Sequence, residues 1–370
     1  VLSVTAQKPC STGSGVYLTE VVRSLAKMGV SQAVVAGVTR EDRVDMPEGV
    51  TVYPVYFSSE KLPYPVVGMS DDMPYTSTRY RDMTEEMAGQ FKAAFLEVLD
   101  EAIEKENPDI ILCHHLYYLT ALIRAHYPAK KVYGFCHNTD LRQMESILFE
   151  RNFIRQEIPK LDRIFALQEA QKEKIKKIYP VSEKQMTVIG TGYNSEVFKK
   201  TGIKSSRKDG KIRMIFAGKI TQKKGVKSLL RALNLLDYEK EKIQLILAGG
   251  AGNLVEYEEI KELADGCRYP VVFAGCVTQS RLAELYNDCD IFVLPSMYEG
   301  LPLTVIESLA CGDRVVMTKL EGIAEWLADM VPDADIRYVL PPGMKGTDEP
   351  LEEELPALES RLAEALREAI

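Results

Sequence analysis

The sequence lacks several features that would each indicate a particular class of protein. No apolar run approaches the ~20 residues that a helix needs to cross a bilayer. The seven cysteines are scattered singly, with no Cys-x-x-Cys pair, which favours free thiols in a reducing compartment over a disulfide framework. A net charge of −8 argues against general binding to nucleic acid. These absences together favour a cytoplasmic globular protein.

The composition and length allow two domains of ordinary size. The chain has 370 residues, of which 46% are apolar and 27% charged. The charge is unevenly spread, because residues 151–200 hold eleven Lys and Arg against six Asp and Glu, whereas residues 321–370 hold four against thirteen. The basic stretch is a candidate for peripheral contact with anionic lipid at the inner face of a membrane. The alternative interpretation is a solvated helix face.

Short β-branched runs alternate with segments of helical periodicity, and the pattern occurs twice. Near-continuous apolar strands joined by helices indicate parallel sheets that are covered on both faces. We therefore expect an α/β protein with two Rossmann-like, doubly wound domains that face each other across an inter-domain cleft. The predicted strands are residues 1–5, 33–38, 50–55, 110–113, 131–135, 163–167 and 187–189 in the first half, and 213–217, 244–248, 271–274, 291–294 and 314–317 in the second.

The predicted boundary between the domains lies in a polar, basic stretch around residues 194–213. We assign residues 1–200 to an N-terminal Rossmann-like domain and residues 201–352 to a C-terminal Rossmann-like domain. A last helix, from about residue 353 to 370, has leucines on one face and must bury them. One place for that helix is back across the first domain.

The turn after the first strand contains Thr12-Gly13-Ser14-Gly15. Glycine lets the backbone pass close to a ligand, and the helix that follows offers unpaired N–H groups to a phosphate. A Gly-x-Gly pair alone is weak evidence, since it occurs in many plain turns. The third glycine of the dinucleotide fingerprint is missing, which counts against a nicotinamide dehydrogenase.

A lysine-rich segment, residues 217–225, follows the first strand of the second half. Its Lys219 and Lys224 are expected near the carboxyl end of a parallel strand, where such sheets bind ligands. Two ammonium groups there can neutralise a diphosphate leaving group. A solvated, Lys-rich turn is the alternative.

The most specific segment, residues 294–312, reads as a strand end, a glycine-containing loop and a helix. Glu299 lies in the loop and Glu307 about a turn into the helix. One carboxylate can then reach a sugar hydroxyl and the other a ribose, with the helix N-terminus aimed at a phosphate.

This frame resembles the retaining glycosyltransferases of family 4 (group 1), which have the GT-B fold. Their hallmark is two glutamates separated by seven residues in a Pro-Ser…Glu-Gly…Glu-x-x-Ala-x-Gly frame. Residues 12–17, 192–194 and 218–225 resemble the donor-phosphate loop, the Asn-Gly-Val-Asp turn and the Gly-Arg…Lys-Gly segment of the family, in the same order. Two departures stand out. Lys219 replaces the usual Arg and loses its planar fork, and Gly312-Asp313-Arg314 replaces Gly-x-Pro, which predicts a less rigid turn.

The resemblance implies roles for individual residues. Glu299 should contact the donor sugar, Glu307 the ribose, and Lys219 and Lys224 the diphosphate. Backbone amides of the loop and helix start should hold the phosphate and the sugar, and Val277 should lie beside the base. The complete set of predicted donor-binding residues is Gly13, Gly15, Gly218, Val277, Gly300, Leu301, Pro302, Leu303, Thr304 and Glu307.

Three of the four histidines follow predicted strands. His137, in His137-Asn138-Thr139-Asp140, resembles the His-Gly-Thr-Asp segment that the family places at the donor sugar, so we predict a catalytic role for it. His114, His115 and Asp140 are candidates for the acceptor side. His126 is expected to have no function.

The predicted function is therefore retaining transfer of a hexose from a nucleotide diphosphate sugar to an acceptor hydroxyl, without a metal or other cofactor. A UDP-sugar is favoured over a GDP-sugar. Asp288-Cys289-Asp290 resembles a metal-binding Asp-x-Asp motif, but its place between a helix and a strand favours a structural role. The alternatives are a nucleotide-sugar 2-epimerase or a phosphorylase of the same fold, and a protein that binds a nucleotide sugar without turnover.

Overall fold

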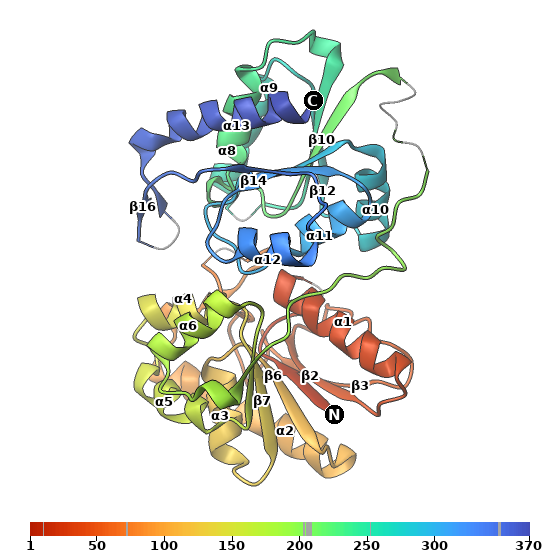
Figure 1. Ribbon diagram of the computed structural model, residues 1–370. Coiled ribbons are helices and arrows are strands. Elements are labelled where there is room, and N and C mark those ends of the chain that lie inside the picture. Colours follow the sequence, from red (N-terminus) through yellow and green to blue (C-terminus); the bar gives the residue numbers. More distant parts are fainter. Residues whose placement is uncertain (10, 72, 203, 205–208, 252, 347–348) are drawn as a thin grey trace. The chain divides into compact units, whose positions relative to one another are not determined.

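The computed structural model describes residues 1–9, 11–71, 73–202, 204, 209–251, 253–346 and 349–370. Cys10 of the first glycine turn and residues 205–208 of the predicted linker lie outside the described residues. The chain forms two compact units, Val1–Gly190 and Thr191–Ile370 (Figure 1). Each unit is an α/β fold built on a parallel sheet, as the alternating pattern predicts.

The first unit contains a seven-stranded parallel sheet with the order β3-β2-β1-β6-β7-β8-β9. The residues of β1 and β2 are completely buried, because helices cover both faces of the sheet. A separate pair of short parallel strands, β4 and β5, adjoins this core. The strands are β1 (Leu2–Thr5), β2 (Ala33–Val38), β3 (Thr51–Tyr56), β4 (Val67–Gly68), β5 (Thr78–Arg79), β6 (Ile110–His114), β7 (Lys131–Phe135), β8 (Arg163–Ala166) and β9 (Met186–Val188).

The longest helix of the first unit illustrates how local sequence sets the element boundaries. Thr84 caps the helix, its side chain accepting from the N–H of Met87, and Asn107 ends it in a left-handed conformation. Between these caps Phe91 and Phe95 lie on the buried face. The helices of this unit are α1 (Gly13–Lys27), α2 (Glu85–Glu106), α3 (Tyr118–His126), α4 (Thr139–Ser146), α5 (Arg151–Glu157) and α6 (Glu169–Ile178).

The second unit contains a six-stranded parallel sheet with the order β12-β11-β10-β13-β14-β15. Its last strand was not predicted, because it is short and only its final residue is buried. The strands are β10 (Ile212–Ala217), β11 (Ile243–Ala248), β12 (Val271–Gly275), β13 (Ile291–Leu294), β14 (Arg314–Thr318) and β15 (Ile336–Val339), with β16 (Met344–Lys345) and β17 (Glu349–Pro350) as a separate antiparallel pair.

The last helix packs within the second unit, which corrects the expectation that it returns to the first domain. In Figure 1 α13 lies beside α8, and it also contacts β14 and β15. Leu358, Leu362 and Leu366 are completely buried there, so the leucine stripe completes one face of this sheet. The helices of the unit are α8 (Val226–Asn234), α9 (Leu254–Asp265), α10 (Gln279–Asp288), α11 (Leu303–Ala310), α12 (Ile323–Met330) and α13 (Leu355–Ala369).

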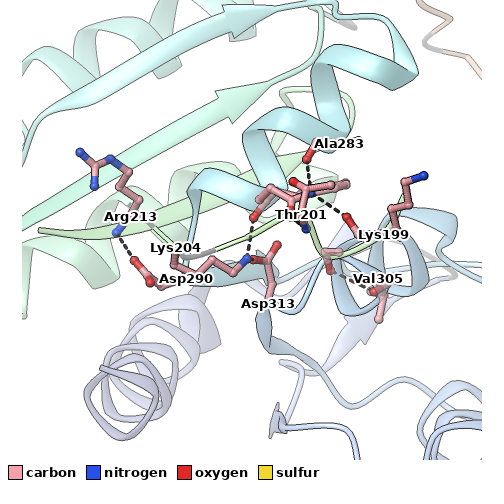
Figure 2. A network of polar contacts seen from close by, with 11 residues as sticks. Lys199, Thr201, Lys204, Arg213, Ala283, Asp290, Val305 and Asp313 are labelled. Carbon is pink, nitrogen blue, oxygen red and sulfur yellow. Dashed lines mark hydrogen bonds and ion pairs between the residues drawn. The ribbon is translucent and has the colours of Figure 1, made fainter. Parts of the chain in front are cut away.

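The segment before β10 also belongs to the second unit, although the sequence assigned residues up to 200 to the first domain. Asn287 of α10 accepts from the N–H of Thr201 at 2.7 Å and donates to the carbonyl of Lys199 at 3.0 Å (Figure 2). Lys204 donates to the Asp313 carboxylate at 2.6 Å, in a buried ion pair. The turn at Asp313, which the sequence predicted to be less rigid, is therefore fixed by a charged partner.

The order of the strands determines where each sheet can bind a ligand. In the first sheet β2 and β3 lie on one side of β1, and β6 to β9 lie on the other side. In the second sheet β11 and β12 lie on one side of β10, and β13 to β15 lie on the other. The strand order therefore reverses between β1 and β6 and between β10 and β13. Loops at the carboxyl ends of strands that flank such a switch point form the binding crevice of doubly wound sheets. The segments singled out in the sequence follow β1, β6 and β7 in the first unit, and β10, β12 and β13 in the second.

Candidate functional site

The glycine turn of the first unit forms a capped helix start. The hydroxyl of Thr12 accepts from the N–H of Gly15 at 3.2 Å, and this places the N-terminus of α1 directly after β1. A Cβ atom added to Gly13 would meet none of the described residues within 4 Å, and Gly13 has no positive φ. The described part of the first unit therefore does not require glycine at this position, and its backbone can be approached by a ligand.

Three histidine rings gather where β6 and β7 end. His114 Nδ1 and His137 Nε2 are 3.1 Å apart, and their rings are stacked with centroids 5.3 Å apart. The His115 ring lies 4.8 Å from that of His137. Tyr17 of α1 packs edge-on against His137 at 5.4 Å, so the structure brings the glycine turn and the histidines together. Tyr17 lies at the end of the segment that resembles the donor-phosphate loop, but its ring was not predicted to contact the histidines.

Burial keeps these imidazoles neutral. It lowers the pKa of His114 to about 3, and His115 adds to the effect. Burial also lowers the pKa of His115 and takes that of His137 well below its ordinary value. His114 and His115 are each 4% exposed, so the structure buries two residues predicted for the acceptor side, whereas His137 is half-buried.

Asp140, the third acceptor-side candidate, has a structural task. It is 0% exposed, and one carboxylate oxygen accepts from the N–H of Leu116 at 2.7 Å. The carboxylate also accepts from the N–H groups of His137 and Leu141. It thereby links the chain after β6 to the chain after β7. Both stretches contain a residue with positive φ, His115 at 75° and Asn138 at 71°. Asp140 thus holds two strained strand ends together.

In the second unit, the loops after β10 and β13 are packed directly on each other. A Cβ atom at Gly225 would lie 2.1 Å from the carbonyl oxygen of Pro295, and the φ of Gly225 is +73°. The N–H of Met297 donates to the carbonyl of Lys223 at 2.9 Å. A Cβ atom at Gly249 of the next loop would lie 1.8 Å from the carbonyl oxygen of Gly218. Gly225 and Gly249 are therefore required for this packing.

This packing brings Lys224 and Glu299 together. Lys224 ends the 3₁₀ turn Gln222–Lys224, which Thr221 caps, and its Nζ atom lies 2.6 Å from Oε1 of Glu299. The two side chains are 27% and 13% exposed, so the pair remains accessible at the surface of the unit. Lys219 follows β10 directly and is half-buried. The loops after β10 and β13 therefore hold an ammonium group and a carboxylate side by side.

The helix after the Glu299 loop has a start suited to an anion. Among the residues that the structure describes, no side chain caps the N-terminus of α11, and its first turn contains no acidic residue. Such a start leaves backbone N–H groups, here those of Leu303 and Thr304, for a phosphate. Glu307 lies on this helix and is 6% exposed, packed near Tyr286. Gly300 is half-buried, Leu301 and Pro302 are buried, and Val277 is half-buried in the loop after β12.

The Asp-x-Asp segment is part of the sheet framework. Asp290 accepts from the N–H of Arg213 at 3.0 Å through its side chain and pairs the starts of β10 and β13 (Figure 2). Over the residues that the structure describes, no group of three or more His, Cys, Asp or Glu side chains could hold a metal ion.

The basic stretch 151–200 has many internal partners. Lys172 and Lys176 pair with neighbouring glutamates, Lys160 pairs with Glu157, and Arg151 donates to two carbonyl groups. Among the described helices, none combines the length and the apolar character that crossing a bilayer requires. Contact of this stretch with lipid stays a prediction.

Comparison with known proteins places both units in one family. A family model described as Glycosyltransferase Family 4 matches residues 11–197, and one described as Glycosyl transferases group 1 matches residues 198–348. An uncharacterized glycosyltransferase of Methanocaldococcus jannaschii is 29% identical over 172 residues, which cover 44% of this chain and 44% of that protein. The match therefore spans less than half of that relative.

Solved structures share the fold over the whole chain. Sucrose-phosphate synthase from Thermosynechococcus elongatus has a TM-score of 0.71 at 16% identity, covering 100% of this chain and 93% of that one. Anabaena HepE in complex with UDP-glucose has a TM-score of 0.62 at 15% identity, covering 100% and 93%. The two-domain α/β class predicted from the sequence is thus confirmed as GT-B-like. The chain belongs to the group 1, family 4 glycosyltransferases.

Proposed function

We propose that this protein is a retaining hexosyltransferase that moves a sugar from a nucleotide diphosphate donor to an acceptor hydroxyl without a metal. The observation that carries the proposal is the Lys224–Glu299 ion pair, which lies in the loops that lead to the uncapped start of α11. A cation and free amides suit a diphosphate, and a carboxylate suits sugar hydroxyls. A UDP-sugar is favoured over a GDP-sugar, in line with the UDP-glucose bound to HepE.

The main chemical task is to stabilise the departing diphosphate. Lys219, Lys224 and the amides of Leu303 and Thr304 provide fixed positive potential for the charge that develops on the leaving oxygen. When the donor binds, Lys224 turns from Glu299 to the phosphate. Glu299 is thereby released to bind the sugar, and Glu307 binds the ribose. These groups fill the place that a metal ion takes in other glycosyltransferases.

The first unit supplies His137 at the donor sugar, together with the glycine turn. The acceptor hydroxyl attacks the anomeric carbon on the face that the diphosphate leaves, which gives retention without a carboxylate nucleophile on the enzyme. The acceptor is a hydroxyl of a cell-surface glycan, a glycolipid or a small-molecule glycoside.

A screen of nucleotide sugars tests the proposal. Each UDP- and GDP-sugar is added in excess chelator, and the melting temperature and any product are measured. We expect one donor to raise the melting temperature, and transfer to a hydroxyl acceptor to release nucleotide diphosphate without metal. Conversion of the donor to its 2-epimer without acceptor would indicate the epimerase. Binding without any release would indicate a binding protein, and loss of activity in chelator would refute metal independence.

The Gly13→Ala variant tests whether Gly13 is required for donor binding or for the stability of the fold. Because a Cβ atom at this position has open space, the melting temperature should stay within a few degrees of wild type, equivalent to about 1 kcal/mol. The added methyl group obstructs a phosphate or sugar above the turn, so donor affinity should fall at least tenfold. Titration calorimetry measures the affinity. Unchanged affinity would remove Gly13 from the donor site.

A further inference from the structure

The hydrogen-bond partners of the histidine pair at the ends of β6 and β7 indicate which ring nitrogens are protonated. His114 presents Nδ1 and His137 presents Nε2 to the bridge, at 3.1 Å. The second nitrogen of His114, Nε2, is buried and has no hydrogen-bond partner among the described residues. The second nitrogen of His137, Nδ1, is not among the buried unpartnered atoms, and the ring is half-buried.

Two proton arrangements satisfy a bridge between two neutral imidazoles, since each ring carries a single N–H. In the first, His114 donates from Nδ1 and His137 carries its own proton on Nδ1. In the second, His137 donates from Nε2 and the proton of His114 lies on the buried Nε2. The second arrangement leaves an N–H group in the protein interior without an acceptor, whereas the first leaves only an unused lone pair. Orphaned buried N–H groups are the rarer and costlier defect.

We propose that His114 is a positioning residue that holds His137 in its Nδ1-protonated form, so that His137 serves the reaction as a neutral hydrogen-bond donor and not as a base. The inference rests on the proposed function for its link to catalysis, whereas the proton arrangement itself depends only on this unit. While Nε2 of His137 accepts from His114, neither nitrogen of the ring can take up a proton. Its N–H group remains available for a hydroxyl or oxygen of the substrate.

The surroundings hold both rings in this arrangement. Phe135 stacks on His114 at 4.8 Å with an interplanar angle of 12°, and Tyr17 from α1 contacts the edge of His137. The carboxylate of Asp140 is used by backbone N–H groups, and no described carboxylate hydrogen-bonds to either ring. A histidine that acts as a base normally has such a partner for its imidazolium form.

The other titratable groups around the pair do not alter this conclusion. They are His115 beside His114, Tyr17 from α1, and Cys136 and Asp140 on the segment of His137, with Lys174 of α6 near Cys136. Burial raises the pKa of Tyr17 to about 12, and it lowers the pKa of both bridged histidines. Near neutral pH the pair therefore stays neutral, and the bridge keeps a single hydrogen.

The matched variants are His114→Asn and His114→Gln. The amide of Asn occupies nearly the position of Nδ1, so it can donate to His137 Nε2. The amide of Gln extends to the position of Nε2, which has no partner. We expect His114→Gln to lower kcat about tenfold, the cost of one neutral hydrogen bond, and His114→Asn to recover most of that loss. The pH–rate profile of His114→Gln should gain an inflection on its acidic side that the wild type lacks, because a nitrogen of His137 is then free to take up a proton.

Nitrogen-15 NMR of histidine-labelled full-length protein reads the tautomer directly. The chain has only four histidines, so a His137→Asn spectrum assigns the signals. We expect Nδ1 of His137 to be protonated in wild type and His114→Asn, and the proton to move toward Nε2 in His114→Gln. Protonated Nε2 in the wild type, or an identical tautomer in all variants, would overturn the proposal even if transfer proceeds. The expected tautomer without any transfer would instead refute the proposed function alone.

Discussion

Replacing Lys224 or Glu299 by Ala should reduce turnover by about 100-fold or more, if each supplies the ~3 kcal/mol that a transition-state contact of this kind provides. In the structure the two side chains neutralise each other at 2.6 Å. Removing Lys224 takes away the positive charge that meets the diphosphate and leaves the Glu299 carboxylate there without its counter-ion. Removing Glu299 takes away the sugar contact. The losses should appear in kcat. A melting curve of each variant shows whether it remains folded.

The stability of the two variants distinguishes a catalytic role of Lys224 and Glu299 from a purely structural ion pair. A pair that is partly exposed contributes at most about 1 kcal/mol, so both variants should remain folded. Lys223→Ala is the matched control, because it removes a neighbouring ammonium group from the same turn and leaves the backbone contact to Met297 intact. It should change kcat less than threefold. Turnover at the wild-type level in Lys224→Ala or Glu299→Ala would remove that residue from the mechanism.

Asp140→Ala should be the most destabilising of these substitutions. The variant leaves three backbone N–H groups, of Leu116, His137 and Leu141, without their acceptor in the interior. Each unsatisfied buried donor costs about 1–3 kcal/mol, so the free energy of unfolding of the first unit should fall by at least 3 kcal/mol. The strained backbone at His115 and Asn138 also loses its restraint. Thermal and urea unfolding measure the loss.

Asp162→Ala is the control for this experiment. Its carboxylate accepts a backbone N–H from Val132 at 2.9 Å and an N–H of the buried Arg124 at 3.0 Å, but its side chain is 44% exposed, so water can reach both donors. Arg124 also keeps its bonds to the carbonyls of Tyr127 and Lys130, so we expect a smaller loss of stability, about 1–2 kcal/mol. Equal stability of Asp140→Ala and wild type would show that Asp140 is not the structural link described above.

The sequence predicts elements well where one local signal dominates. Ala33–Val38, Lys131–Phe135 and Ile291–Leu294 were predicted with their observed bounds, because each is a compact β-branched or apolar run. The ends of α2 coincide with local signals of the same kind, since a Thr cap begins the helix and Asn107-Pro108 ends it. In contrast, β15 was missed, because Arg337 and Tyr338 give it no apolar continuity.

These local patterns do not predict contacts between residues that lie far apart in the sequence. The Lys204–Asp313 ion pair joins positions 109 residues apart, and neither position has a local signal for the other. The same is true of the task of Asp140, which depends on two strands that the sequence cannot place side by side. The spacing of Glu299 and Glu307 identified the candidate site, but the pairing of Glu299 with Lys224 required the packing of Gly225 on Pro295.

The central claim is that the second unit binds a diphosphate with lysine side chains and the start of α11. A crystal structure of the full chain with UDP, prepared in excess chelator, tests it most directly. We expect phosphate oxygens within hydrogen-bond distance of the amides of Leu303 and Thr304, and Lys224 Nζ turned from Glu299 to the phosphate. A diphosphate bound elsewhere, with the Lys224–Glu299 pair undisturbed, would contradict it.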